Sequence, residues 1–521
     1  YQNPAYTTLG GRYGVTDWGG SGRIYAMRLY DRRLAASELK INANFDKIRF
    51  DGADADSLDW PDGYCLTNGA IYVRVGATGT EASPVSVGGE AFAAATNAWF
   101  LSGSEITVAV RPGESPFALV WSGVPAGAVY TATSVTFTVS VPAELSATVR
   151  APAVKTWRGA TSTLASLAAN WAGEEVPASG DAVVLDADSG PMTWDLDDVA
   201  PGSWTQAAGC TSTVTFLTGR ADDSRTRGFL SADGETRELR VAGDVTLAGG
   251  VWTHEKTPSL TSASAGWIDG RGVYRLVARV GGDLQIGAGA AVDVSTNGFA
   301  AYQGPGYAYS NHGAAHGGLG GSYWESYAVH VNRRFTYGSV KAPRTIGSGS
   351  NSRGGGGIEL TVSGKTVLEG GLRANGQTHS WYCGAGGGIF LVTGSLEGSG
   401  AIQARGGIGT TAGSAGGGRI AVILTDPGAA FGAYTGDVSA AQGNAQRSYA
   451  GTVYLETPAD AGKGTLLIKG VGGLDLRQRG LATALEDPSD DYSFGTVILT
   501  NNVLLGICSN CTVRAERILG T

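Results

Sequence analysis

Three copies of one glycine-rich pattern decide the fold of this chain: GGGGIELTVSGKTVLEGGLRANG (354–376), GAGGGIFLVTGSLEGSGAIQARGG (384–407) and SAGGGRIAVILTD (414–426). Ile358, Ile389 and Ile420 mark the same position in each copy and are 31 residues apart. A fixed period of this length is typical of solenoids, in which each unit buries its apolar face only by stacking on its neighbours.

Apolar and polar residues alternate inside each copy, as in a β-strand with one buried face. Ile358 and Leu360 fall on one face, and Glu359 falls on the other. The glycine runs precede these strands, where we expect each coil to bend sharply and to pass close to the next one. The pattern predicts an all-β chain in which residues 153–521 form a right-handed parallel β-helix.

The composition agrees with a folded repeat protein. Glycine accounts for 83 of 521 residues, more than twice the roughly 7% of average usage, without the triplet period of collagen. Charged residues make up only 16% and apolar residues 42%, which is richer in core-forming residues than a disordered chain. The 38 basic and 46 acidic residues give a net charge of −8 without a basic stripe, so we expect neither nucleic-acid binding nor direct membrane insertion.

The first 152 residues lack the repeat and predict two smaller units. In residues 1–52, an alternating strand at 23–30 precedes a short helix at 31–39. This stretch resembles the last strand and exit helix of laminin-G-like, concanavalin-type jelly rolls, which implies a jelly-roll remnant. Residues 53–152 contain short, evenly spaced strand patterns without a helix signal, which predicts a small all-β module.

Two further motifs resemble segments of bacterial surface proteins. GSEITVAVRPGESPFALVWSGVPAG (103–127) resembles the divergent internalin-type repeat, whose members act as spacers. We expect Trp121 in this motif to be a core residue rather than an exposed platform for sugars. KTWRGATSTLASLAANWAGEEVPASGDAVVL (155–185) resembles the block that begins many autotransporter-like passengers. This resemblance implies that Trp157, Asn170, Trp171 and Asp181 cap the first coil.

The repeats at 239–470 resemble the glycine-rich parallel β-helix regions of giant secreted bacterial surface proteins. The resemblance implies an extracellular or cell-surface location and a non-catalytic structural or adhesive role, with glycans or other surface proteins as partners. Because the chain opens at Tyr1 without a signal peptide, we expect a processed piece of a longer protein. An incomplete jelly roll leaves a sheet edge uncovered, so residues 1–52 are expected to dock on this chain or on a second copy, and head-to-tail assembly into a filament follows from the second case.

Parallel β-helices also host glycosidases and polysaccharide lyases, which need paired or clustered acidic residues. In the register of the repeats, the outward neighbours of the aligned isoleucines are Glu359, Phe390, Ala421 and Tyr454. These positions contain no acidic pair. We therefore expect no catalytic residue, and we expect Glu359 to be a solvated charge.

One insertion between the coils is also consistent with a second function, in binding or cleaving carbohydrates. Residues 299–353 interrupt the coils and are rich in aromatic residues, which suit stacking against sugars. The simpler interpretation, which we favour, is a loop that shields one face of the solenoid. The candidates for glycan binding are Tyr307, Tyr309, Tyr323, Trp324, Tyr327 and Arg333. The alternative function is a carbohydrate-active enzyme, either a glycosidase or a polysaccharide lyase, with its site in this insertion.

No pattern predicts a cofactor or a metal centre. His312 and His316 have the spacing of a helical zinc pair, but the surrounding NHGAAHGGLGG cannot form a stable helix. Cys508 and Cys511 lack a second CxxC, which predicts a local disulfide or two free thiols rather than a redox or zinc site. The acidic cluster at 486–491 is expected to be a solvated loop rather than a calcium site.

Overall fold

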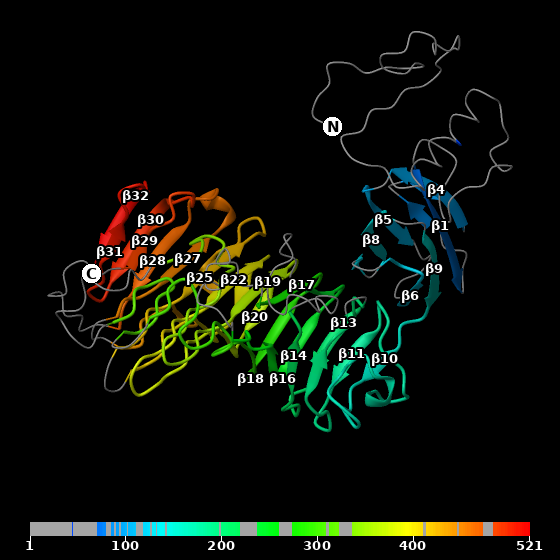
Figure 1. The fold of residues 1–521 in the computed structure, drawn as a ribbon, viewed down its shortest axis with the longest axis horizontal. Coiled ribbons are helices and arrows are strands. Elements are labelled where there is room, and N and C mark those ends of the chain that lie inside the picture. The colour runs from blue at the N-terminus through cyan, green and yellow to red at the C-terminus, as the bar shows by residue number, and fades with distance from the viewer. Residues whose placement is uncertain are drawn as a thin grey trace, which may run out of the picture.

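The computed structural model is all-β, with 43% of its residues in strands and large parallel sheets, in agreement with the predicted class (Figure 1). It describes residue 44 and the ranges 70–79, 85–87, 90–92, 95–101, 103–110, 118–125, 128–131, 133–140, 143–196, 199–218, 237–259, 274–308, 312–321, 336–409, 413–444, 448–471 and 483–520. The expected strand at 23–30 and helix at 31–39 lie outside these residues. Of residues 1–52 only Asn44 is described, and it is helical and buried.

Two small sheets precede the repeats. The first has the order β4 (Ala95–Leu101), β1 (Ala70–Gly79), β9 (Ala143–Arg150), β6 (Ala118–Ser122). The second has the order β3 (Glu90–Phe92), β2 (Val85–Val87), β5 (Glu105–Val110), β8 (Ser134–Thr138), β7 (Val129–Tyr130). An apolar cluster that includes Val108, Val135 and Leu145 joins them, and Trp121 is partly buried and packs against this cluster.

A twelve-stranded parallel sheet forms one side of the repeat region. Its main path is β10 (Val154–Thr156), β11 (Ala182–Leu185), β13 (Ser203–Gln206), β16 (Val245–His254), β18 (Leu284–Asp293), β21 (Gly371–Arg373), β24 (Ala401–Gln403), β26 (Val438–Ser439). Beside this path lie β12 (Met192–Trp194), β14 (Thr213–Phe216), β20 (Thr366–Leu368) and β23 (Leu396–Glu397). Strands that are neighbours in this sheet come from successive turns of the chain, as stacking of repeats requires.

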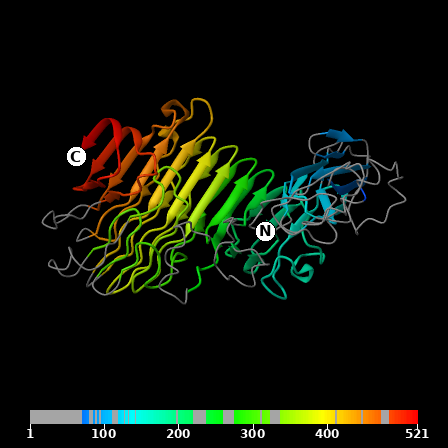
Figure 2. The ribbon, with the colours of Figure 1, turned by 45° about the horizontal axis from the view of Figure 1, so that its top comes forward.

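A nine-stranded sheet forms the other side. Its order is β15 (Leu239–Val241), β17 (Leu276–Val280), β19 (Gly357–Val362), β22 (Gly388–Thr393), β25 (Arg419–Leu424), β27 (Thr452–Glu456), β28 (Thr465–Lys469), β30 (Ser493–Thr500), β32 (Arg514–Gly520). The remaining elements are a pair of strands, β29 (Thr483–Leu485) and β31 (Leu505–Ile507), and three short 3-10 helices, η2 (Ala168–Asn170), η5 (Phe431–Ala433) and η6 (Pro458–Asp460). Figure 2 shows the strands from β17 to β27 as a row of parallel arrows.

The register of the repeats is as predicted. Ile358 pairs with Ile389, which pairs with Ile420, and the three side chains are at most 1% exposed. They belong to one apolar cluster that extends between the two large sheets from Trp157 to Val453. The 31-residue period therefore corresponds to one step along the stack.

Aromatic residues fill the beginning of this cluster. Trp157 and Trp171 are both buried, with ring centroids 5.1 Å apart in an edge-to-face arrangement, as expected for residues that close the first coil. Asp181 lies nearby but has a different role. Its carboxylate accepts two hydrogen bonds from Arg150 at 2.7 and 2.5 Å, and this ion pair ties β9 of the small module to the first coil.

The prediction of one parallel winding through residue 521 is wrong after β27. Strand β28 pairs with β27 in the antiparallel direction, whereas β28, β30 and β32 are again parallel to one another. The cause is a tight reversal in which Pro458 begins a 3-10 turn, Asp460 caps the nitrogen of Thr457, and Ala461 and Gly462 adopt positive φ.

The outward positions that follow the aligned isoleucines are also not in water, contrary to our expectation for Glu359. Phe390, Ala421 and Tyr454 are at most 7% exposed, because residues from the insertion and from β28 to β30 cover them. Glu359 is 6% exposed and accepts hydrogen bonds from Arg275 at 2.9 Å and from Arg344 at 2.8 Å. Burial raises the pKa of Glu359, but these two guanidinium groups outweigh that effect and hold the pKa below its usual value.

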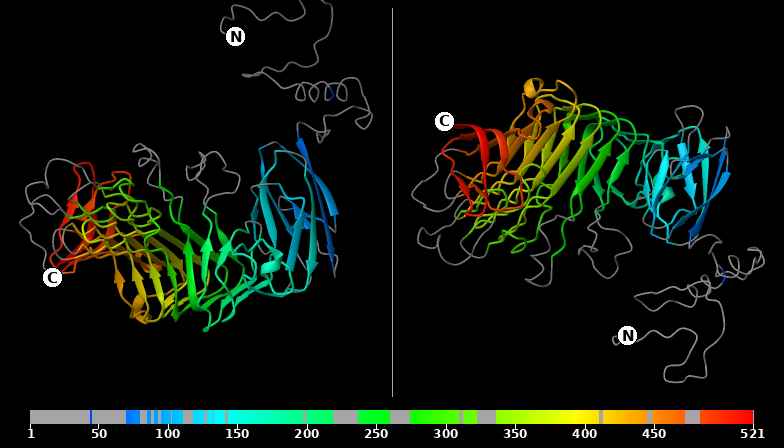
Figure 3. Two further views of the ribbon diagram at one scale, coloured as in Figure 1. Left: turned by 60° about the horizontal axis from the view of Figure 1, so that its bottom comes forward. Right: turned by 90° about the horizontal axis from the view of Figure 1, so that it is seen from above.

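Glycine-rich segments connect the two sheets and pack directly on one another (Figures 2 and 3). We call them the glycine layer, which comprises residues 294–308, 312–321, 345–356, 374–387, 404–409, 413–418, 440–444 and 448–451. Within one coil, Gly387 donates a hydrogen bond to the carbonyl of Ala374, and between coils Gly386 donates one to the carbonyl of Gly416.

Close approach of main chains is what these glycines permit. A Cβ atom on Gly387 or Gly418 would overlap the carbonyl oxygen of the corresponding glycine in the preceding coil. Neither residue adopts the left-handed conformation, so the expected sharp bend is not the reason for glycine here. The requirement is space, because the backbones lie too close for any side chain.

Candidate binding surface

Only one of the six predicted glycan-binding residues falls within the described part of the chain. Tyr307 is half-buried, and its main-chain nitrogen donates a hydrogen bond to the carbonyl of Gly304 at 3.1 Å. The other five candidates lie outside the described residues: Tyr309, Tyr323, Trp324, Tyr327 and Arg333. Whether the six residues form one surface stays a prediction.

The described parts of the insertion pack into the glycine layer. Ala314 donates a hydrogen bond to the carbonyl of Cys383 and accepts one from Gly416, so the insertion lies against two later coils. His316 is fully buried, with one ring nitrogen 2.7 Å from the carbonyl of Gly386 and the other 2.7 Å from the hydroxyl of Thr345. Both nitrogens are therefore occupied, and no cluster of metal-ligand side chains occurs within the described ranges.

The acidic cluster is a largely exposed loop, as expected, but three of its carboxylates also bind the insertion. Glu486 accepts a hydrogen bond from the nitrogen of Thr336 at 2.7 Å, and Asp490 accepts one from the nitrogen of Val340 at 2.9 Å. Asp491 pairs with Lys341, and the hydrogen bond between them lowers the pKa of this carboxyl below its usual value. These carboxylates hold residues 336–341 of the insertion against the C-terminal strands.

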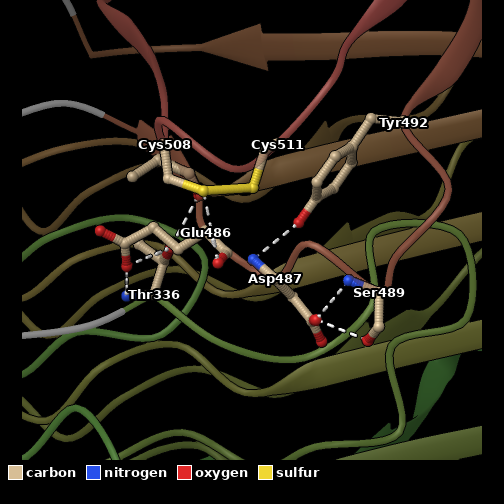
Figure 4. Close-up of a disulfide and its surroundings, with 8 residues drawn as sticks. Thr336, Glu486, Asp487, Ser489, Tyr492, Cys508 and Cys511 are labelled. Atoms are coloured by element: carbon tan, nitrogen blue, oxygen red, sulfur yellow. Dashed lines mark hydrogen bonds between the residues drawn. A yellow bond between two sulfur atoms is a disulfide. The ribbon is translucent and has the colours of Figure 1, made fainter.

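A disulfide joins Cys508 to Cys511 and supports this loop from the other side (Figure 4). The nitrogen of Cys508 donates a hydrogen bond to the carbonyl of Leu485 at 3.1 Å, which places the disulfide next to the main chain of Glu486. Figure 4 shows Glu486 between the disulfide and Thr336. Of the two predicted states, the disulfide is the one present.

Three exposed large apolar side chains lie on separate segments of the glycine layer. The exposed fractions are 40% for Tyr302, 53% for Trp381 and 51% for Ile408. We call these three residues the loop edge. Large apolar side chains exposed together on neighbouring loops are typical of interaction surfaces.

Hydrogen bonds tie the three loops to one another. The hydroxyl of Tyr302 donates to Asn351, and the adjacent Ser352 donates to the carbonyl of Gln377 at 2.9 Å. One coil further on, the nitrogen of Ile408 donates to the hydroxyl of Thr378 at 3.2 Å. Hydrogen bonds therefore connect the loops that carry the three exposed side chains.

The loop that carries Trp381 is braced from inside. The nitrogen of Trp381 donates a hydrogen bond to a ring nitrogen of His379 at 3.2 Å, and the nitrogen of His379 donates to the sulfur of Cys383 at 3.3 Å. Burial raises the pKa of the Cys383 thiol to about 11, so it stays protonated at neutral pH. The indole of Trp381 therefore lies on a short turn that these hydrogen bonds hold in place.

Our reading of the sequence missed Trp381, although a signal for it exists. In the alignment of the repeats, THSWYC (378–383) lies between two segments of the glycine layer. At the same position the next copy has Ile408 and a short polar stretch. A tryptophan in a variable loop between invariant repeat elements indicates a surface role, because the core positions of the coil are already filled.

No protein-family model, curated protein or solved structure matches this chain. The resemblances to internalin-type repeats, autotransporter passengers and laminin-G-like jelly rolls therefore stay predictions. Within the described ranges, the structure contains no helix that is both long enough and apolar enough to cross a membrane.

Proposed function

We propose that the chain is a non-catalytic, adhesive segment of a bacterial extracellular surface protein, and that its repeat region is a right-handed parallel β-helix. The parallel sheets, the 31-residue register and the single core between the sheets support the β-helix. A stack of this kind forms an extended scaffold whose loops vary while its core repeats. The extracellular location rests on the resemblance of the repeats and on the predicted disulfide chemistry of Cys508 and Cys511.

The observation that carries the adhesive role is the loop edge. Main-chain hydrogen bonds hold the glycine-layer segments of each coil together. The loops between these segments can therefore carry large exposed side chains such as Trp381 without disturbing the backbone. A rigid aromatic surface loses little conformational entropy on binding, and its face suits the apolar faces of sugars. We propose glycans as the ligands of the loop edge.

The enzyme alternative needs two available carboxylates next to the insertion. Glu359, Glu486 and Asp490 lie against its described parts, but each already accepts hydrogen bonds from an arginine or from the main chain of the insertion. A general acid or base must instead exchange protons with a substrate. Their existing partners support a structural use of these acids.

A glycan array with the wild-type chain and the variant Trp381→Ala tests this function. We expect binding to a defined set of glycans that falls at least about tenfold in the variant, since loss of an aromatic anchor at the centre of a site costs more than 1.4 kcal/mol. Leu164→Ala, which removes an apolar side chain of similar exposure far along the stack, is the control and should bind like the wild type. Equal binding by all three proteins would contradict the role of the loop edge, and release of shortened sugars from a bound glycan would support the enzyme.

A further inference from the structure

A polar groove crosses the outer face of the twelve-stranded sheet. It has a volume of about 500 Å³ and is lined by residues of β14, β16 and β18 and of the segments that follow them. These three strands are neighbours in the sheet, and Figure 1 labels them side by side. Hydroxyl, amide and charged side chains dominate its lining: Thr213, Thr215, Val251, Thr253, His254, Glu255, Lys256, Asp293, Ser295, Thr296 and Asn297.

The floor of the groove follows from the register of the strands. Thr215 pairs with Thr253, and Trp252 pairs with Val292, so Asp293 continues the column of Thr253 in the third strand. Side chains at paired positions of adjacent strands point to the same face and are about 4.8 Å apart. The floor therefore presents one polar group per strand at a regular spacing along the stack.

Several of these groups have hydrogen-bonding capacity to spare. Among the described residues, the hydroxyls of Thr213 and Thr215 have no hydrogen-bond partner, and Lys256 is exposed without an ion-pair partner. Asp293 accepts one hydrogen bond from the nitrogen of Ser295 at 2.9 Å and lies 3.9 Å from the guanidinium of Arg373, which still leaves acceptor positions on its carboxylate. Donors and acceptors thus alternate within one open groove.

One wall of the groove is held rigidly. The side-chain nitrogen of Asn297 donates hydrogen bonds to the hydroxyl of Thr253 at 2.9 Å and to the carbonyl of His254 at 2.7 Å. His254 is buried beneath, where its ring nitrogen accepts a hydrogen bond from Gly357. Preformed polar walls reduce the entropy lost when a ligand binds.

We propose that this groove binds a neutral polysaccharide chain laid along the stacking direction of the strands. A chain of sugar rings offers hydroxyl groups at regular intervals, which matches a floor that repeats with every strand. The carboxylates of Glu255 and Asp293 are balanced by Lys256 and by Arg373, which lies 3.9 Å from Asp293, so the groove has no net charge that would attract an acidic polymer. An extended peptide instead needs the free edge of a sheet, and the floor here is the face of a fully paired one.

Affinity electrophoresis of the whole chain in gels that contain xylan, galactomannan or mixed-linkage β-glucan, with alginate as the acidic comparison, tests the proposal. We expect at least one neutral polymer to retard the wild type. The double variant Thr213→Val/Thr215→Val keeps β-branched side chains and removes the two unpaired hydroxyls, so its affinity for that polymer should fall roughly tenfold. The Trp381→Ala variant should bind as the wild type does, which separates this groove from the loop edge.

The matched control is Thr205→Val/Thr246→Val. These two threonines pair with each other in β13 and β16 of the same sheet, are also partly buried and do not line the groove. The control should retain wild-type affinity and should unfold at the same temperature as the groove variant. The proposal is overturned if no neutral polymer retards the wild type, if alginate retards it more strongly, or if the groove variant and the control bind equally.

Discussion

The main-chain nitrogen of Gly418 donates a hydrogen bond of 2.7 Å to the carbonyl oxygen of Ala404. The same bond recurs one coil earlier between Gly387 and Ala374 and is again 2.7 Å long. This bond joins the segment that follows a strand of the twelve-stranded sheet to the segment that precedes the next strand of the nine-stranded sheet. In this layer, contact between main chains replaces contact between side chains.

The substitution Gly418→Ala should destabilise the chain by about 3 kcal/mol, because the added methyl group overlaps the carbonyl oxygen of Gly387 and the packed backbone cannot shift. The control is Gly432→Ala in η5, where an added Cβ atom meets no other atom within 4 Å. Urea unfolding followed by tryptophan fluorescence measures both. Equal stability of the two variants would show that the glycine layer is loosely packed.

Removal of the buried carboxylate in Glu359→Gln should cost about 3 kcal/mol at pH 7, because Arg275 and Arg344 then lose their counter-charge. The pKa of Glu359 is lowered in the folded chain, so its stabilisation is present above the ordinary value of about 4.3 and is lost as the pH falls through the folded pKa. The difference between the variant and the wild type should therefore shrink in acid. Glu397→Gln, which changes a half-exposed carboxylate 4.0 Å from Lys365, should have almost no effect at either pH.

Two buried histidines should make the fold sensitive to mild acid. Burial lowers the pKa of His316 to about 3, with help from the positive charge of Arg419, and burial lowers the pKa of His254 to about 4. In the unfolded chain each histidine binds a proton near pH 6.5, so stability is complete above that value and falls by about 1.4 kcal/mol per pH unit for each histidine below it. Urea unfolding between pH 6.5 and 5 measures this slope. The variant His316→Gln should lose about half of it, whereas an unchanged slope would mean that His316 is not buried in the neutral form.

Reduction of the Cys508–Cys511 disulfide should destabilise the C-terminal strands by about 2 kcal/mol, since the bond closes only a very short loop. Hydrogen exchange should increase in β29 and β31, where Cys508 bonds to the carbonyl of Leu485, and in the insertion arm that Glu486 holds. The variant Cys508→Ser/Cys511→Ser should show the same exchange with and without reductant. Faster exchange throughout the stack would contradict a local role.

The candidate binding surface was less accessible to sequence reasoning than the fold. The aromatic content of the insertion gave six candidate residues, and five of them lie outside the described ranges. Trp381 stands exposed on a loop whose position follows from the repeat alignment. Aromatic content alone does not separate an exposed indole from a buried one, and the chain contains both kinds, as Trp157 shows.

The sequence by itself determined the strand content, the parallel stacking and the pairing of Ile358, Ile389 and Ile420, because a period-two pattern repeated at a constant interval has few ways to bury its apolar face. Only the tertiary structure decided what happens on the other face. Alternation shows which side chains share a face, but whether water or protein covers that face depends on segments distant in the chain. Glu359 is buried because Arg344 of the insertion reaches it, and Tyr454 is buried because the chain reverses after β27 and packs back on its own sheet.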